Sequence, residues 1–214
     1  MVDTPAPYIS RRALLALPLL GLAGPALAAR GKVVTILGDS ITAGLGLPAA
    51  EALPAQLHLA LSRLGVANVV RGAGVSGDTT AGGAARVDFS VQPDTAVVVV
   101  ALGGNDLLQG LDPRVIRANL EKILGRLAAR RMGVVLAGIA APPEIGRSYA
   151  RDFDAVFAGL ARTRRLPFYP DLLAGVGRNP ALKQSDGVHP NAKGVRLIAG
   201  RLAPVVAKAL AARP

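Results

Sequence analysis

The chain of 214 residues contains no cysteine, no tryptophan and only two histidines. Without cysteine it cannot form a disulfide, a thiolate zinc site or a cysteine nucleophile. Any chemistry that requires an imidazole must use His58 or His189. A metal site is also disfavoured, because no histidine is spare to serve as a ligand if one of the two acts as a base.

Aromatic residues are scarce, at 3% of the chain, although the formal net charge is +11. A basic protein can bind nucleic acid or an anionic membrane surface. Here the aromatic residues are not interleaved with the basic ones, so no platform for stacking bases is visible. The densest basic pairs, Arg130–Arg131 and Arg164–Arg165, fall at the ends of predicted helices, where cations complement the helix dipole. We expect no nucleic-acid partner and at most weak peripheral contact with a membrane.

The first 28 residues have the pattern of an export signal. Arg11–Arg12 precede an apolar stretch broken by proline and glycine, and the stretch ends in Ala26–Leu27–Ala28, an A-x-A cleavage pattern. The arginine pair resembles a twin-arginine signal. We expect residues 1–28 to be cleaved and residues 29–214 to form one periplasmic or secreted domain. An uncleaved helix or a lipid-facing anchor is the alternative.

Short apolar runs alternate with amphipathic segments along the rest of the chain. This alternation predicts an α/β fold, a three-layer α/β/α sandwich with a central, mostly parallel five-stranded sheet. Asp112 and Pro113 predict the start of the clearest helix, as its N-cap and first residue. Strands are predicted over 32–37, 67–70, 95–102, 133–140 and 166–170, and helices over 51–65, 79–91, 112–131, 145–165 and 191–211.

Polar residues follow the predicted strands, where parallel sheets bind ligands. Ser40 follows the first strand, Asn105 the third, and Asp186 and His189 the fifth. A hydroxyl, an imidazole and a carboxylate at one edge indicate nucleophilic catalysis, with Ser40 attacking an acyl carbonyl, His189 as the base and Asp186 orienting it. The Asn105 amide, a glycine N–H of the second loop and the Ser40 N–H are candidate oxyanion donors.

Each of these residues also has a simpler interpretation. Ser40 can cap a helix, and Asn105 can stabilise its own loop. His58 lies within a predicted helix and is taken as structural or exposed. The neighbouring acids Asp39, Asp78 and Asp106 are interpreted as hydrogen-bond acceptors that fix loops.

Residues 72–77, "GAGVSG", match the G-x-G-x-x-G pattern of dinucleotide-binding loops. A dinucleotide fingerprint follows the first strand of its fold and is followed by an acid that ends the next strand. This one follows the second predicted strand, and Asp94 precedes a strand instead. We keep a non-catalytic nucleotide- or lipid-binding module as the alternative of another class, and expect Gly72 and Gly74 to let the loop turn.

The segments "GDSITAG" (38–44), "SGDTT" (76–80), "GGND" (103–106) and "DGVHPN" (186–191) resemble the four sequence blocks of the SGNH, or GDSL, hydrolases. Among these, the chain is most similar to the bacterial periplasmic acyl-CoA thioesterase, lysophospholipase and arylesterase subgroup. Ile41 stands where the family name has leucine. No G-x-S-x-G elbow of the α/β-hydrolases occurs. The resemblance implies a flavodoxin-like fold, no cofactor, a Ser40–His189–Asp186 triad, and Gly77, Asn105 and Ser40 as oxyanion donors.

We therefore expect a monomeric serine esterase or thioesterase acting on small-molecule esters with small to medium acyl chains, lysophospholipids among the candidate substrates. Leu107 and Leu108, together with residues 141–149, are expected to line or cover the acyl site. A carbohydrate O-acetylesterase is the alternative within enzymes, although a chain without tryptophan offers little surface for stacking on sugars.

Overall fold

The computed structural model describes residues 1–4 and 31–213. The predicted export signal therefore lies outside the described residues, apart from its first four. The strands are β1 (Lys32–Gly38), β2 (Asn68–Gly74), β3 (Thr95–Ala101), β4 (Gly133–Ala137) and β5 (Phe168–Tyr169). The helices are α1 (Ser40–Ala43), α2 (Leu53–Arg63), α3 (Thr80–Ser90), α4 (Gly104–Leu108), α5 (Pro113–Ala129), α6 (Arg147–Arg164) and α7 (Ala192–Ala211), with short 3-10 turns at Ala49–Glu51, Pro143–Ile145 and Pro180–Leu182.

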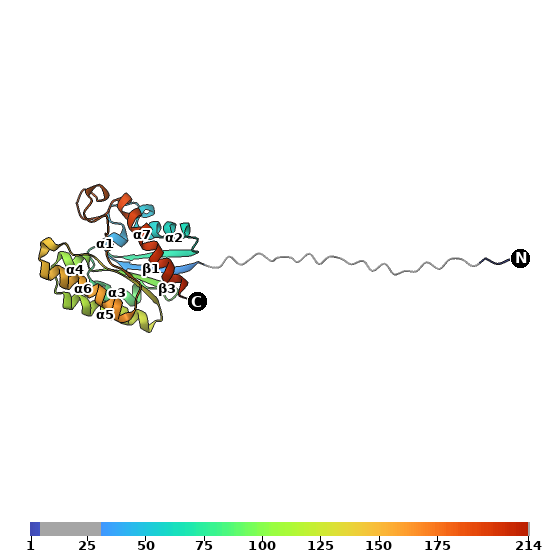
Figure 1. Ribbon diagram of the computed structural model, residues 1–214, viewed down its shortest axis with the longest axis horizontal. Coiled ribbons are helices and arrows are strands. Elements are labelled where there is room, and N and C mark those ends of the chain that lie inside the picture. Colours follow the sequence, from blue (N-terminus) through green and yellow to red (C-terminus); the bar gives the residue numbers. More distant parts are fainter. Residues whose placement is uncertain (5–30, 214) are drawn as a thin grey trace.

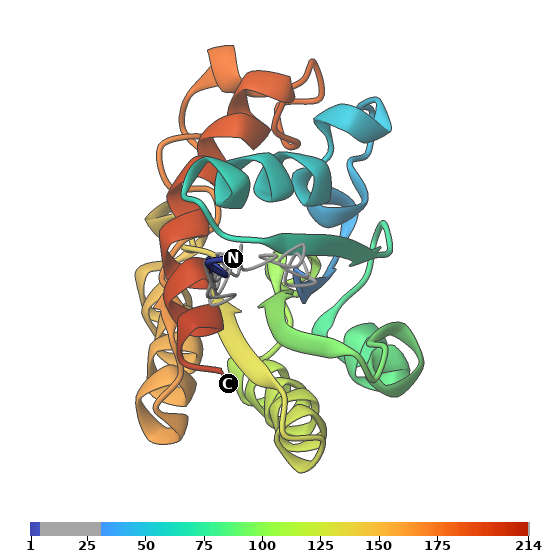
Figure 2. The ribbon, with the colours of Figure 1, turned by 90° about the vertical axis from the view of Figure 1, so that its right-hand side faces the viewer.

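The five strands form one parallel sheet in the order β2-β1-β3-β4-β5. Helices α2 and α7 cover one face and α3, α5 and α6 the other, which gives three layers (Figures 1 and 2). The predicted fold class is confirmed. Because the chain leaves β1 and β3 in opposite directions across the sheet, the switch point of this flavodoxin-like order lies between their carboxyl ends.

Local sequence explains the two clearest elements. The β3 sequence TAVVVVA is buried along almost its whole length, as expected for a central parallel strand covered on both faces. Helix α5 begins at Pro113, and the side chain of its N-cap, Asp112, accepts a hydrogen bond from the Arg114 N–H. The predicted N-cap, Asp112, and the predicted first residue, Pro113, are thus both confirmed.

Strand β2 continues to Gly74, four residues beyond its predicted end. Gly72 and Gly74 are therefore strand residues, and the prediction that they let a loop turn is wrong. A Cβ on Gly74 would lie 2.4 Å from the Ala43 nitrogen of α1, and one on Gly72 would lie 2.7 Å from Cγ of Pro54. These glycines allow the edge strand to approach the helices beside it closely.

Within residues 1–4 and 31–213, no helix combines the length and the apolar character needed to cross a bilayer.

Candidate active site

Ser40 is the first residue of α1, two residues after the end of β1, and lies at the predicted edge of the sheet. The side chain of Asp39 caps this short helix by accepting a hydrogen bond from the Ile41 N–H at 3.0 Å. Ser40 is only 8% exposed. The end of β1 and the cap together hold the hydroxyl in one place.

His189 connects Ser40 with Asp186. Its Nε2 lies 2.9 Å from Ser40 Oγ, and its Nδ1 lies 2.6 Å from Asp186 Oδ2. The other carboxylate oxygen of Asp186 accepts hydrogen bonds from the backbone N–H groups of Val188 and His189. The hydrogen bond with His189, with help from those two N–H groups, lowers the pKa of Asp186 to about 2. Asp186 is thus an anion at neutral pH and can orient the imidazole.

The loop that carries Asp186 and His189 is fastened by side-chain amides. Gln184 Nε2 donates to the carbonyls of Leu45 and Pro190, at 2.8 and 3.0 Å. Asn191 Nδ2 donates to the Lys183 carbonyl at 3.0 Å, and its Oδ1 caps α7. The loop is therefore tied both to the segment after α1 and to the start of α7.

Two of the predicted oxyanion donors come from neighbouring segments, Gly77 from the loop between β2 and α3 and Asn105 from the first turn of α4. Gly77 has a φ of +82°, the left-handed region that favours glycine. Asn105 Nδ2 donates one hydrogen to the Asp78 carbonyl at 2.9 Å, and the amide has a second hydrogen. Among the described residues, the N–H groups of Ser40 and Gly77 have no acceptor. These donors are candidates for a developing negative charge.

The three neighbouring acids fix loops, as predicted. Asp106 is fully buried and accepts hydrogen bonds from the N–H and hydroxyl of Thr80, at 2.8 and 2.5 Å. Asp78 pairs with Arg86 at 2.7 Å. Asp39, the cap of α1, is 4% exposed. Burial raises the pKa of Asp39 to about 6, against the opposing effects of the Ile41 N–H and the charge on His189.

His58 is exposed, and its Nδ1 lies 2.9 Å from Asn68 Oδ1, so its structural interpretation holds.

A cleft of about 160 Å³ opens beside Ser40 and His189. Leu107 and Leu108 are among the residues that line it, and Leu108 is 71% exposed. Its full lining is Asp39, Ser40, Ile41, Gly104, Asn105, Leu107, Leu108, Ile139, Leu173, Val188 and His189.

Residues 141–149 are not among the residues that line this cleft, and whether they cover the acyl site stays a prediction. Ile139, two residues after β4, stands there instead, with Leu173 and Val188 from the region after β5. Sequence reasoning missed these three apolar residues. The only sequence feature that points to them is that each follows a strand, at the edge of the sheet where the site lies.

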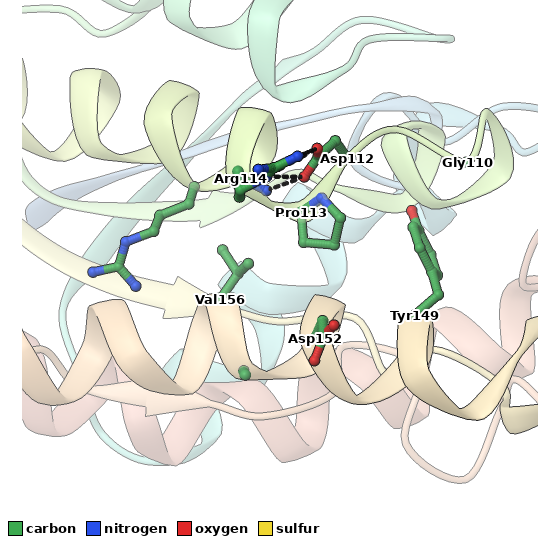
Figure 3. A pocket seen from close by; sticks show the side chains of 9 residues that line it. Gly110, Asp112, Pro113, Arg114, Tyr149, Asp152 and Val156 are labelled. Atoms are coloured by element: carbon green, nitrogen blue, oxygen red, sulfur yellow. Dashed lines mark hydrogen bonds and ion pairs between the residues drawn. The ribbon is translucent and has the colours of Figure 1, made fainter.

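A larger hollow of about 710 Å³ lies between α5 and α6 (Figure 3). Arg114 points back to Asp112, with which it forms an exposed ion pair, and Tyr149 donates to the Leu111 carbonyl at 2.8 Å. Neither Ser40 nor His189 lines this hollow. The smaller cleft is therefore the one that reaches the reactive groups.

Residues 36–197 match the model of the GDSL-like lipase/acylhydrolase family. The chain belongs to this family. It is 36% identical over 180 residues to esterase TesA of Pseudomonas aeruginosa, covering 84% of this chain and 90% of that protein. It is 36% identical over 166 residues to thioesterase 1/protease 1/lysophospholipase L1 of Escherichia coli K12, covering 77% and 78% of the two chains.

Among solved structures, the crystal structure of AlinE4, an esterase of the SGNH-hydrolase family, has 42% sequence identity. It covers 84% of this chain and 96% of its own, with a TM-score of 0.70. For this GDSL-family chain, the predicted resemblance and subgroup are confirmed. The glycine pattern at 72–77 thus belongs to a hydrolase fold, within an edge strand and the loop after it.

Proposed function

We propose that the protein is a serine esterase or thioesterase that hydrolyses carboxylic esters through an acyl-enzyme on Ser40. The observation that carries this proposal is the continuous hydrogen-bonded chain from Ser40 Oγ through His189 to Asp186. Membership of a family of lipases and acylhydrolases supports it independently.

The geometry favours the following steps. His189 Nε2 accepts the proton of Ser40 Oγ while Oγ attacks the acyl carbon, and Asp186 stabilises the resulting imidazolium. The tetrahedral intermediate then loses the alcohol or thiol, which takes its proton from His189. A water molecule next gives a proton to His189 and attacks the acyl-enzyme, and the acid leaves as Ser40 regains its proton.

As the tetrahedral intermediate forms, the N–H groups of Ser40 and Gly77 and the side-chain amide of Asn105 donate hydrogen bonds to the negatively charged acyl oxygen. Losing one such donor typically costs about 2.7–4 kcal/mol of transition-state stabilisation. The left-handed backbone at Gly77 and the bond from Asn105 to Asp78 hold two of these donors before substrate binds. The role of each donor is part of the proposal.

The cleft favours small to medium acyl chains. It is small, and Leu107, Ile139, Leu173 and Val188 make most of its wall apolar. The names of the relatives, esterase and thioesterase/lysophospholipase, support oxygen esters, thioesters and lysophospholipids as candidate substrates. The pattern of residues 1–28 supports export as the route by which the enzyme reaches a periplasmic or extracellular substrate.

The test is Ser40→Ala, assayed with p-nitrophenyl acetate and p-nitrophenyl octanoate. We expect turnover of both esters to fall to the background rate, because the remaining groups have no nucleophile to activate. Ser62→Ala removes an exposed serine of α2 and serves as the matched control, with activity unchanged. Wild-type activity in Ser40→Ala would overturn the proposed function.

A further inference from the structure

Arg86 lies in α3 and its side chain makes four hydrogen bonds, three of them to the segments around the loop between β2 and α3, residues 75–79. Its Nε donates to Asp78 Oδ2 at 2.7 Å. One terminal nitrogen donates to the Ala73 carbonyl of β2 at 2.9 Å and to Ser90 Oγ at 3.1 Å, and the other donates to the Gly38 carbonyl of β1 at 2.8 Å. One guanidinium thus joins the ends of two strands to the loop between β2 and α3.

These contacts lead to the proposed oxyanion donors. Asp78 follows Gly77 directly, and its own N–H donates to the Val75 carbonyl at 3.1 Å, so fixing Asp78 also restrains the turn that carries the Gly77 N–H. The carbonyl of the same Asp78 accepts the hydrogen bond from Asn105 Nδ2. Gly38 precedes the Asp39–Ser40 pair at the start of α1. Arg86 thus binds Asp78, which is the neighbour of one donor, Gly77, and the hydrogen-bond partner of the other, Asn105. It also binds the Gly38 carbonyl, two residues before the proposed nucleophile.

The environment makes these contacts strong. The side chains of Arg86 and Asp78 are only 18% and 13% exposed. A charged guanidinium that donates in fixed directions holds its partners more firmly than a flexible ammonium does. Shielding from water also reduces screening of the ion pair.

We propose that Arg86 is a positioning residue for the oxyanion hole, fixing the Gly77 N–H and the Asn105 amide relative to Ser40. The inference rests on the proposed function. Arg86 does not touch the substrate in this account; it acts through Asp78. A misplacement of about 1 Å in a catalytic group can cost on the order of 10²-fold in rate.

The first test compares Arg86→Met with Arg86→Lys by stopped-flow acylation with p-nitrophenyl acetate. We expect the acylation rate constant to fall on the order of 10²-fold in Arg86→Met, with little change in the substrate dissociation constant. Arg86→Lys should recover part of the rate, because an ammonium can pair with Asp78 but cannot reach both strand carbonyls. The control is Arg126→Met, which removes an ion pair with Asp88 and a bond to the Ala84 carbonyl elsewhere on α3.

A double-mutant cycle with Asn105→Ala separates positioning from general stability. If Arg86 works through the donors, Arg86→Met should cost less in the Asn105→Ala background than in the wild type. Equal costs in the two backgrounds, or an unchanged acylation rate in Arg86→Met, would overturn the inference.

Two further variants keep the test decisive. If Arg86→Met does not fold by circular dichroism, Asp78→Asn breaks the same ion pair and leaves the Asp78 carbonyl in place; a wild-type acylation rate in it contradicts the inference. Ser40→Ala separates a failure of the proposed function from a failure of the proposed role of Arg86. Activity in Ser40→Ala defeats the proposed function, whereas an inactive Ser40→Ala with fully active Arg86→Met and Asp78→Asn defeats only the role of Arg86.

Discussion

The two sides of the site are anchored in different ways. On the side of the proposed oxyanion donors, Asp106 is fully buried and the Arg86 and Asp78 side chains are 18% and 13% exposed, and these groups tie loops to the body of the fold. On the acid–base side, the Asp186 side chain is 45% exposed, whereas the His189 side chain, at 20%, is about as shielded as that of Arg86. The Asp186 carboxylate accepts its backbone hydrogen bonds from its own loop, from the N–H groups of Val188 and His189.

This difference separates the expected effects on stability from the expected effects on catalysis. Groups on the buried side have partners that would be left without hydrogen bonds, so their loss is expected to destabilise the fold. An exposed group such as Asp186 can be replaced with little change in folding, because water takes over its hydrogen bonds. The exposed loop should therefore hold residues whose main effect is on the reaction.

The largest expected effect is on the exposed side. Asp186→Asn removes the charge that orients His189 and stabilises its imidazolium, and we expect kcat to fall by on the order of 10⁴-fold. Steady-state hydrolysis of p-nitrophenyl acetate at neutral pH measures this. Asp171→Asn, which changes an acid whose Oδ1 accepts a bond from the Leu173 N–H, is the control. A loss of tenfold or less would mean that Asp186 does not orient the base.

Asp39 lies between the two sides, and its effect depends on pH. Its pKa rises from 3.8 to about 6 in the fold, mainly through burial, with the charge of Asp78 adding to the rise and that of His189 opposing it. The native state therefore binds more protons than the unfolded state between about pH 4 and 6, and stability falls as pH rises through this window.

Asp39→Asn should abolish that fall, because the amide does not titrate and still accepts the bond from the Ile41 N–H. Above about pH 6, the variant should be more stable than the wild type by up to about 3 kcal/mol. Urea unfolding of both proteins at a series of pH values measures the difference. The same pH dependence in both would show that Asp39 does not titrate in this window.

The smallest expected effect is on stability, and it is measured by comparing alanine variants of two acids, Asp106 and Asp186. Asp106→Ala leaves the Thr80 N–H and hydroxyl without their acceptor, so we expect a loss of about 1–3 kcal/mol in the free energy of unfolding. Asp186→Ala should change the urea midpoint far less, while lowering kcat far more. If Asp186→Ala destabilised the protein as much as Asp106→Ala does, the two sides would not differ as described.

Sequence periodicity predicted the architecture, and strand-end positions predicted four candidate site residues, Ser40, Asn105, Asp186 and His189, whereas Gly77 came from the resemblance to the family. The valine run of β3 and the Asp112–Pro113 start of α5 carry local signals, since each depends on neighbours within a few residues. Ser40, Asn105, Asp186 and His189 were candidates because each follows a strand, and parallel strands end at one edge. These residues needed no knowledge of side-chain packing.

What sequence reasoning missed depends on contacts between distant segments. Gly74 resembles a loop residue until β2 is seen to pass within contact distance of α1. Ile139 and Leu173 are ordinary apolar residues whose role follows only from the shape of the cleft. Arg86 is one of many scattered arginines, and its four contacts join segments up to 48 residues away.

The central claim is that Ser40 carries the acyl group during turnover. Rapid mixing with p-nitrophenyl octanoate, followed by acid quench and mass spectrometry of the peptides, tests this most directly. We predict an added octanoyl group on the peptide containing Ser40, absent in Ser40→Ala and formed much more slowly in His189→Ala. An octanoyl group on another residue, or ester hydrolysis with no acylated peptide under conditions that accumulate one, would contradict the account.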